Sequence, residues 1–314
     1  MVSTCRELST AELSELAVCT LSPPAVTDTD SVTEPRVAFV TGASRGIGKA
    51  AAIALAEAGL DVVITGRTVR EGDGVDDSDG AGRSIPGSLE TTAQAIEATG
   101  RRALPVVMDL HDRSTLDAAV QRALDEWGRI DVLVNNAIDT GPGDMTRFED
   151  TPLELLEAKL AANVVSQIVV IKSVLPGMLE RGDGTIVNVT SAVAVIDPQA
   201  PVGEGGWGAM YAMSKGAFHK LAGILAVEVG DRGIRSFNLE PGFVITERME
   251  VNAGALGLAG RYQGAPPSVP GAVIAWMATS PDAAELNGTT ISAQRFALER
   301  SLHPDWRDAK GNGK

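Results

Sequence analysis

The segment Thr41-Gly42-Ala43-Ser44-Arg45-Gly46-Ile47-Gly48 joins a short apolar run to the Ala-rich stretch 49–58. Its three glycines let the backbone turn tightly and approach a ligand closely. The free N–H groups of a helix that begins here would face that ligand and favour a phosphate. A glycine-rich turn by itself is also a plain connection between a strand and a helix. The strand before it and the helix after it favour a dinucleotide site.

Seven short apolar runs from residue 36 onward are predicted to be strands: 37–41, 61–66, 103–108, 131–135, 185–190, 234–239 and 289–292. They are nearly continuous in apolar residues, which is typical of parallel strands buried on both faces. Helical patterns lie between them, over 46–58, 88–99, 114–127, 153–180, 208–230 and 269–279. This alternation predicts an α/β fold, a Rossmann-like doubly wound parallel sheet of about seven strands with helices on both faces.

The same pattern divides the chain into three parts. Residues 36–294 form one predicted dinucleotide-binding catalytic domain, preceded by the extension 1–35 and followed by the tail 295–314. The extension is rich in Ser, Thr, Glu and Pro, and we expect it to be flexible. Segment 71–87 is rich in Gly, Asp and Ser, so we expect a mobile surface loop after the second strand.

The net charge of −14 is concentrated in residues 1–35 and 71–80, which together supply −10. The rest of the chain has no basic run of the kind that binds nucleic acid, and we expect no such partner. No uninterrupted apolar stretch reaches the roughly 18 residues of a membrane span, so we expect no membrane association. Both cysteines, Cys5 and Cys19, lie in the extension, which suits a reducing, cytoplasmic location. The three histidines form no cluster, and we expect no metal.

The spacing Gly-x-x-x-Gly-x-Gly resembles that of the short-chain dehydrogenase/reductase family. Further motifs follow in that family's order: Asn135-Asn136-Ala137 after the fourth predicted strand, Asn163 in the long helix, Ser191 after the fifth strand, Tyr211-x-x-x-Lys215 in the next helix, and Pro241-Gly242 with Thr246 after the sixth strand. Each motif is short, but the ordered set is specific and covers about residues 36–291. The resemblance implies a homo-oligomer, either a dimer or a tetramer.

The chemistry of the catalytic candidates follows from their types. Tyr211 and Lys215 are four residues apart, so their side chains share one face of a helix. A lysine ammonium and a nicotinium ring would both favour the phenolate, so that Tyr211 exchanges a proton with a carbinol. Ser191 would hold the carbonyl oxygen, and the resemblance gives Asn163 a water that links Lys215 to solvent. Each residue taken singly also has a structural explanation. Tyr211 and Lys215 fit a surface pair, Ser191 fits a cap or turn residue, and Asn163 fits a side chain that bonds a buried carbonyl.

The cofactor prediction depends on the end of the second strand. An acidic residue there would bind the ribose 2′-hydroxyl of NAD, but the chain has Gly66 followed by Arg67, with Arg45 nearby in the turn. We therefore expect NADP rather than NAD, unless both arginines are solvated surface residues. The full set of predicted cofactor-binding residues is Gly42, Ser44, Arg45, Gly46, Ile47, Gly48, Arg67, Asp109, Leu110, Asn135, Ala137, Tyr211, Lys215, Pro241, Gly242, Val244 and Thr246.

Together these features predict an NADP-dependent oxidoreductase that interconverts a carbonyl and a secondary alcohol of a small-molecule substrate. One alternative is an epimerase or dehydratase of the same fold, against which stand the glycine spacing and the lack of a sizeable C-terminal substrate domain. Another is a nucleotide-sensing protein without turnover, against which stands the complete set of Asn163, Ser191, Tyr211 and Lys215. The substrate is not predicted, because the loops 193–209 and 247–268 that would contact it are the variable part of the pattern.

Overall fold

The computed structural model describes residues 35–255 and 263–306. The predicted extension, apart from Pro35, lies outside the described residues, as do segment 256–262 of the second substrate loop and segment 307–314 of the tail. The described part of the tail is folded. It belongs to helix α9 (Ala293–Arg300), which buries Ala297, and to a turn in which Trp306 Nε1 donates to the Gln294 carbonyl oxygen at 2.8 Å.

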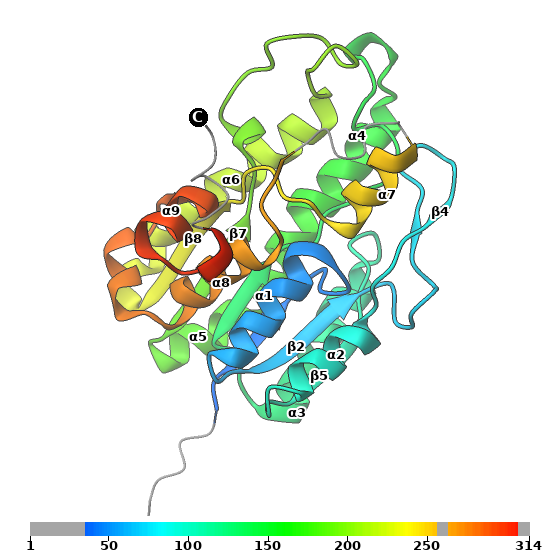
Figure 1. The fold of residues 1–314 in the computed structure, drawn as a ribbon. Coiled ribbons are helices and arrows are strands. Elements are labelled where there is room, and N and C mark those ends of the chain that lie inside the picture. The colour runs from blue at the N-terminus through cyan, green and yellow to red at the C-terminus, as the bar shows by residue number, and fades with distance from the viewer. Residues whose placement is uncertain (1–34, 256–262, 307–314) are drawn as a thin grey trace, which may run out of the picture. The chain divides into compact units, whose positions relative to one another are not determined.

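Seven parallel strands form the central sheet in the order β5-β2-β1-β6-β7-β8-β9 (Figure 1). Their bounds are β1 (Val37–Val40), β2 (Asp61–Gly66), β5 (Ala103–Val107), β6 (Val132–Asn135), β7 (Gly184–Val189), β8 (Ile234–Glu240) and β9 (Thr290–Ser292). The predicted doubly wound fold is confirmed, and each strand matches its predicted run to within a residue. The order reverses between β1 and β6, so the loops after these two strands diverge and leave a crevice at the carboxyl edge.

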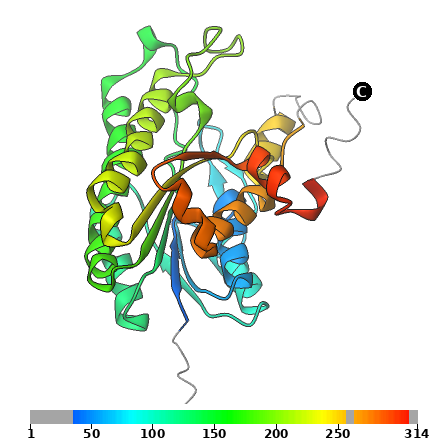
Figure 2. The same cartoon turned by 90° about the vertical axis from the view of Figure 1, so that its left-hand side faces the viewer.

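Helices cover both faces of the sheet, as Figure 2 shows edge-on. One core packs α1 (Gly46–Glu57), α2 (Leu89–Glu97), α8 (Ser268–Thr279) and α9 against the sheet, and the other packs α3 (Arg113–Trp127), α5 (Ser166–Arg181) and α6 (Ala209–Val229). In β1, Ala38 and Val40 enter the first core while Val37 and Phe39 enter the second. This alternation follows from the two-residue period of a strand, and it explains why the run is apolar throughout.

The predicted helix over 153–180 is divided in the structure. Helix α4 (Leu153–Leu160) leads into a π-helical turn over Ala161–Val165 and then into α5. By length and composition the run Leu153–Arg181 could cross a membrane, a test that the core helix of a soluble protein also passes. Here Val170, Val174 and Met178 pack against the sheet, and 44% of the most apolar window is buried. Single π turns often occur at functional sites.

The segment expected to be a mobile loop contains a small antiparallel sheet of β3 (Val75–Asp76) and β4 (Arg83–Ser84). Asp76 is fully buried and accepts a hydrogen bond from Asn252 Nδ2 at 2.7 Å. Asn252 lies on helix α7 (Glu247–Ala255), a helix that the sequence pattern does not predict. A buried carboxylate requires such partners, and they tie the acidic segment to α7 (Figure 1). The sequence pattern gave no sign of this long-range contact.

Candidate functional site

A cavity of about 270 Å³ opens at the carboxyl ends of β1, β2, β5 and β6. Open α/β sheets bind their ligands at this reversal of strand order. Ten of the predicted cofactor-binding residues line it: Gly42, Ser44, Arg45, Gly46, Ile47, Arg67, Asp109, Leu110, Ala137 and Thr246. Sequence reasoning did not place His111, Asp139, Thr140 and Arg248 there, although all four belong to the lining.

The glycine-rich turn forms one wall of the cavity. Gly42 and Gly46 have φ angles of +68° and +57°, in the left-handed region that favours glycine. A Cβ atom on Gly48 would collide with the Gly42 carbonyl oxygen and with the Asn136 amide. That amide donates to the carbonyl oxygens of Thr41 and Gly42 at 2.9 and 3.1 Å. Gly48 thus permits the close packing of the turn on the end of β6, while Gly42 and Gly46 shape the cavity.

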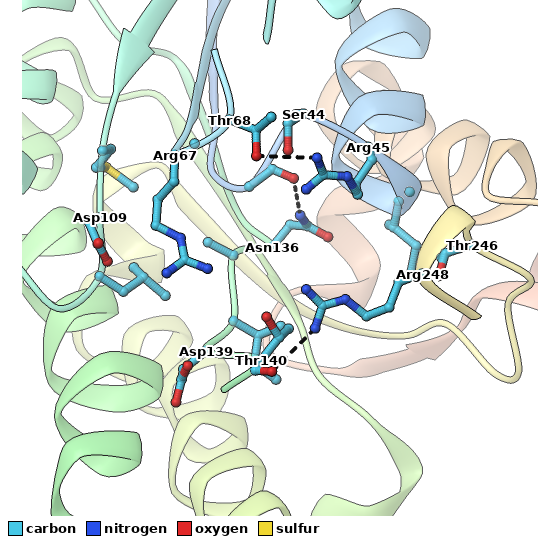
Figure 3. A pocket seen from close by; sticks show the side chains of 18 of the residues that line it. Ser44, Arg45, Arg67, Thr68, Asp109, Asn136, Asp139, Thr140, Thr246 and Arg248 are labelled. Carbon is cyan, nitrogen blue, oxygen red and sulfur yellow. Dashed lines mark hydrogen bonds between the residues drawn. The ribbon is translucent and has the colours of Figure 1, made fainter. Parts of the chain in front are cut away.

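The two arginines predicted to hold the 2′-phosphate have different surroundings (Figure 3). The Arg45 guanidinium donates to the carbonyl oxygens of Pro86 and Gly87 at 2.8 and 2.6 Å and to the Thr68 hydroxyl at 3.2 Å. Arg67 lines the cavity and makes no hydrogen bond or ion pair with any other residue that the structure describes. Arg45 therefore anchors the inserted segment, whereas Arg67 is available to an anion.

Arg248 reaches the cavity from the first turn of α7 (Figure 3). Its Nη1 lies 3.5 Å from Asp76 Oδ1 and 3.5 Å from the Thr140 carbonyl oxygen. Burial lowers the pKa of Arg248, and the charge of Arg67 lowers it further, while Asp76 opposes the shift. Burial and the charge of Arg248 likewise lower the pKa of Arg45. The lining thus holds three guanidinium groups against the two carboxylates of Asp109 and Asp139, a balance that favours an anion.

The structure brings three of the predicted catalytic residues together. The Ser191 side chain, just after β7, hydrogen-bonds to Tyr211 on α6. Lys215, one turn further along α6, is buried and donates from Nζ to the Val189 carbonyl oxygen at 2.8 Å. Burial lowers the pKa of Lys215 to about 8, against the opposing effect of Asp144.

The pKa of Tyr211 departs from the expected direction. Burial raises this pKa, the hydrogen bond from Ser191 lowers it, and the charges of Asp144 and Glu240 raise it further. A motif shows which charged groups stand beside the phenol but not how deeply the phenol is buried, and burial is the largest cause of this shift. In the protein itself Tyr211 is therefore a protonated phenol, which suits a proton donor.

Asn163 lies in the π-helical turn and makes two hydrogen bonds through its side chain. Its Oδ1 accepts from the Asp139 backbone N–H at 2.7 Å, and its Nδ2 donates to Ser214 Oγ at 3.2 Å. Ser214 immediately precedes Lys215 in α6. Asn163 thus joins the loop after β6 to the helix that carries Tyr211 and Lys215.

An ion cluster around the buried Lys159 fixes the loop that follows β6. Lys159 is only 1% exposed, and its Nζ lies 2.7 Å from Asp144 Oδ1 and 3.4 Å from Asp139 Oδ2. His111 Nε2 lies 3.3 Å from Asp139 Oδ1. Burial raises the pKa of Asp139, but the Gly141 N–H and the charge of Lys159 outweigh it and lower the pKa overall. Burial raises the pKa of Asp144 in spite of Lys159. No motif pointed to this cluster.

The other predicted cofactor residues lie behind the cavity or beside it. Asn135 is buried and donates from Nδ2 to Asn188 Oδ1 at 3.0 Å, across β6 and β7. The Pro241 carbonyl oxygen accepts from Gln294 Nε2 at 3.1 Å, and that side chain fills the space beside Gly242. Val244 pairs with Ala265 in an isolated bridge. Among the described residues there is no group of three or more His, Cys, Asp or Glu that could hold a metal ion.

Comparison with known proteins agrees with this geometry. The model of the family "short chain dehydrogenase" matches residues 36–254. The chain is 32% identical over 223 residues to a cyclohexanol dehydrogenase of Rhodococcus sp. (strain TK6), covering 71% of this chain and 79% of that protein. It is also 35% identical over 152 residues to hydroxysteroid dehydrogenase-like protein 2 of Xenopus tropicalis, which is 48% of this chain but only 33% of that relative.

A solved structure shows the same architecture. The short-chain dehydrogenase from Mycobacterium paratuberculosis bound to NAD superposes with a TM-score of 0.66 at 26% identity. The match covers 82% of this chain and 96% of that chain.

Proposed function

Because the chain belongs to the short-chain dehydrogenase/reductase family, we propose that it is an NADP-dependent oxidoreductase that interconverts a carbonyl and a secondary alcohol. Its substrate is a small molecule, and Tyr211 acts as the general acid and base. The observation that carries the cofactor proposal is Arg67, which lines the cavity without a partner among the described residues, directly after Gly66 at the end of β2.

The cavity fits the phosphates of a dinucleotide. The Gly46 N–H at the start of α1 already binds an anion, since it donates to Glu247 Oε2 at 2.9 Å. Arg67 and Arg248 add positive charge to the same cavity. When bound, the nicotinamide supplies or accepts the hydride. The protein's part is to bind the nucleotide, hold the substrate and move one proton.

The proton that accompanies the hydride is moved by Tyr211 and Lys215 of α6, with Ser191 after the end of β7. Ser191 lies within hydrogen-bond reach of Tyr211, and its hydroxyl turns its single proton to the substrate carbonyl oxygen when the substrate is bound. Tyr211 gives that oxygen its proton in reduction and takes it back in oxidation. The buried charge of Lys215 stabilises the phenolate that remains after the proton has left.

The preference for NADP follows from charge at the end of β2. Gly66 offers no carboxylate to the ribose 2′-hydroxyl, and Arg67 is free to pair with a 2′-phosphate. A second cavity shares Arg67 with the first and is also lined by the exposed Asp77, whose charge works against a phosphate. The related structure described above is bound to NAD, and the kinetic comparison below distinguishes the two cofactors.

The test compares kcat/KM for NADPH and NADH over a panel of cyclic and linear ketones. We expect NADPH to be preferred by about tenfold or more, as one charge-assisted hydrogen bond provides. Equal values, or a preference for NADH, would refute the cofactor proposal. Binding without turnover of any ketone or alcohol would favour the nucleotide-sensing alternative, and isomerisation or dehydration without net NADPH consumption would favour the epimerase or dehydratase.

A further inference from the structure

Glu247 lies against the N-terminus of helix α1, where a bound nucleotide would place a phosphate. It is the first residue of α7, and its Oε2 accepts the backbone N–H of Gly46 at 2.9 Å. Gly46 is the first residue of α1, where the unpaired N–H groups and the helix dipole attract anions. The cavity lining includes both Gly46 and Thr246, the neighbour of Glu247.

We propose that Glu247 is an internal competitor of the nucleotide phosphates and thereby sets the affinity for the cofactor. A carboxylate and a phosphate cannot both accept the same N–H. Their negative charges would also repel each other if both lay within hydrogen-bond distance of Gly46. Nucleotide binding then requires Glu247 to leave Gly46. The inference rests on nucleotide binding by the family and is independent of the preference for NADP.

The first turn of α7 carries both the carboxylate that would leave Gly46 and a cation that would face the incoming phosphate. Arg248 follows Glu247 directly and faces the cavity, with only long contacts of 3.5 Å to Asp76 and to the Thr140 carbonyl oxygen. Once a phosphate has displaced Glu247, Arg248 provides the same turn with a favourable charge toward it. The Asn252 bond to the buried Asp76, at 2.7 Å, holds the next turn of α7 to the inserted segment.

The experiment measures binding of ADP and of adenosine by isothermal titration calorimetry at constant ionic strength. ADP carries the phosphates but neither the 2′-phosphate nor the nicotinamide, so the result does not depend on cofactor preference. For Glu247→Gln we expect ADP to bind about tenfold more tightly than to the unmodified protein, because the variant keeps the shape and removes the competing charge. Adenosine affinity should stay within twofold.

Glu250→Gln is the matched control, because Glu250 is exposed on the same helix and its loss changes the net charge equally. It should leave ADP affinity within twofold. An equal gain in both variants would show a general charge effect and overturn the proposal, as would unchanged or weaker ADP binding by Glu247→Gln. A crystal structure of the unmodified protein with ADP gives an independent readout: Gly46 N–H bonded to a phosphate oxygen supports the exchange, and retention of the Glu247 bond refutes it. Failure of the unmodified protein to bind ADP would instead count against nucleotide binding itself.

Discussion

Replacing Lys215 by Met should remove a pH-dependent cost that the folded protein bears at neutral pH. Lys215 is buried, and its pKa falls from 10.5 to about 8. Below pH 8 the ammonium is charged in both the folded and the unfolded chain, and the folded state bears the full cost of burying it. Between pH 8 and 10.5 the folded chain loses its proton first, so the unfolded chain binds more protons and stability rises with pH.

The size of the effect follows from the shift of about 2.5 pKa units, the difference between 10.5 and about 8. At about 1.4 kcal/mol per unit this is about 3 kcal/mol. Lys215→Met also removes the bond to the Val189 carbonyl oxygen, which offsets part of the gain at neutral pH. The informative quantity is therefore how the difference in free energy of unfolding between the two proteins changes with pH. The lost bond contributes to that difference at every pH and so does not affect the change.

The assay is urea denaturation of nucleotide-free protein from pH 7 to pH 10.5, with the free energy of unfolding obtained by linear extrapolation. We expect the unmodified protein to gain about 3 kcal/mol relative to Lys215→Met across this range. A difference that stays constant with pH would show that the Lys215 pKa is not lowered, and a difference of the opposite sign would refute the reasoning about burial.

Three further substitutions test the cavity. Arg67→Ala should raise KM for NADPH about tenfold and leave KM for NADH within twofold. Arg70 is exposed on the same loop, and Arg70→Ala should change neither KM. An equal loss for both cofactors in Arg67→Ala would contradict the assignment. Gly66→Asp should shift the kcat/KM ratio toward NADH, since a Cβ atom there meets only ordinary contacts of 3.6–3.8 Å, and an unchanged ratio would place the ribose elsewhere. Gly48→Ala should lower the free energy of unfolding by about 1–3 kcal/mol, because the added Cβ atom collides with the Gly42 carbonyl. Gly223 has open space in the middle of α6, so Gly223→Ala should be neutral or stabilising. Equal Tm values for the two variants would contradict the packing role of Gly48.

Local sequence was sufficient for the sheet and the glycine-rich turn. The strands are buried on both faces, so their apolar runs mark them directly, as in Val62-Val63-Ile64 of β2. The turn needs glycine at Gly42 and Gly46 for backbone reasons that act within a few residues. The ordered motifs then located most of the cavity lining, because the strand ends of a doubly wound sheet meet at one edge.

The features that the sequence did not reveal depend on partners far along the chain. The inserted segment is held by Asn252, some 176 residues after Asp76, and Arg248 carries no motif of its own. Nothing in the local sequence distinguishes Lys159 from other lysines of a helix, and only the fold shows that it is buried beside Asp144. The direction of the Tyr211 pKa likewise depends on burial, which only the assembled structure supplies.

The central claim is that Tyr211 transfers the proton in hydride transfer, and Tyr211→Phe tests it most directly. The measurement is kcat with the best ketone from the panel, together with the Kd for NADPH from fluorescence titration. The ring is kept and only the proton donor is removed, so kcat should fall by at least ~10² while the Kd stays within twofold. A variant that binds NADPH normally and retains a tenth or more of the activity would contradict the account.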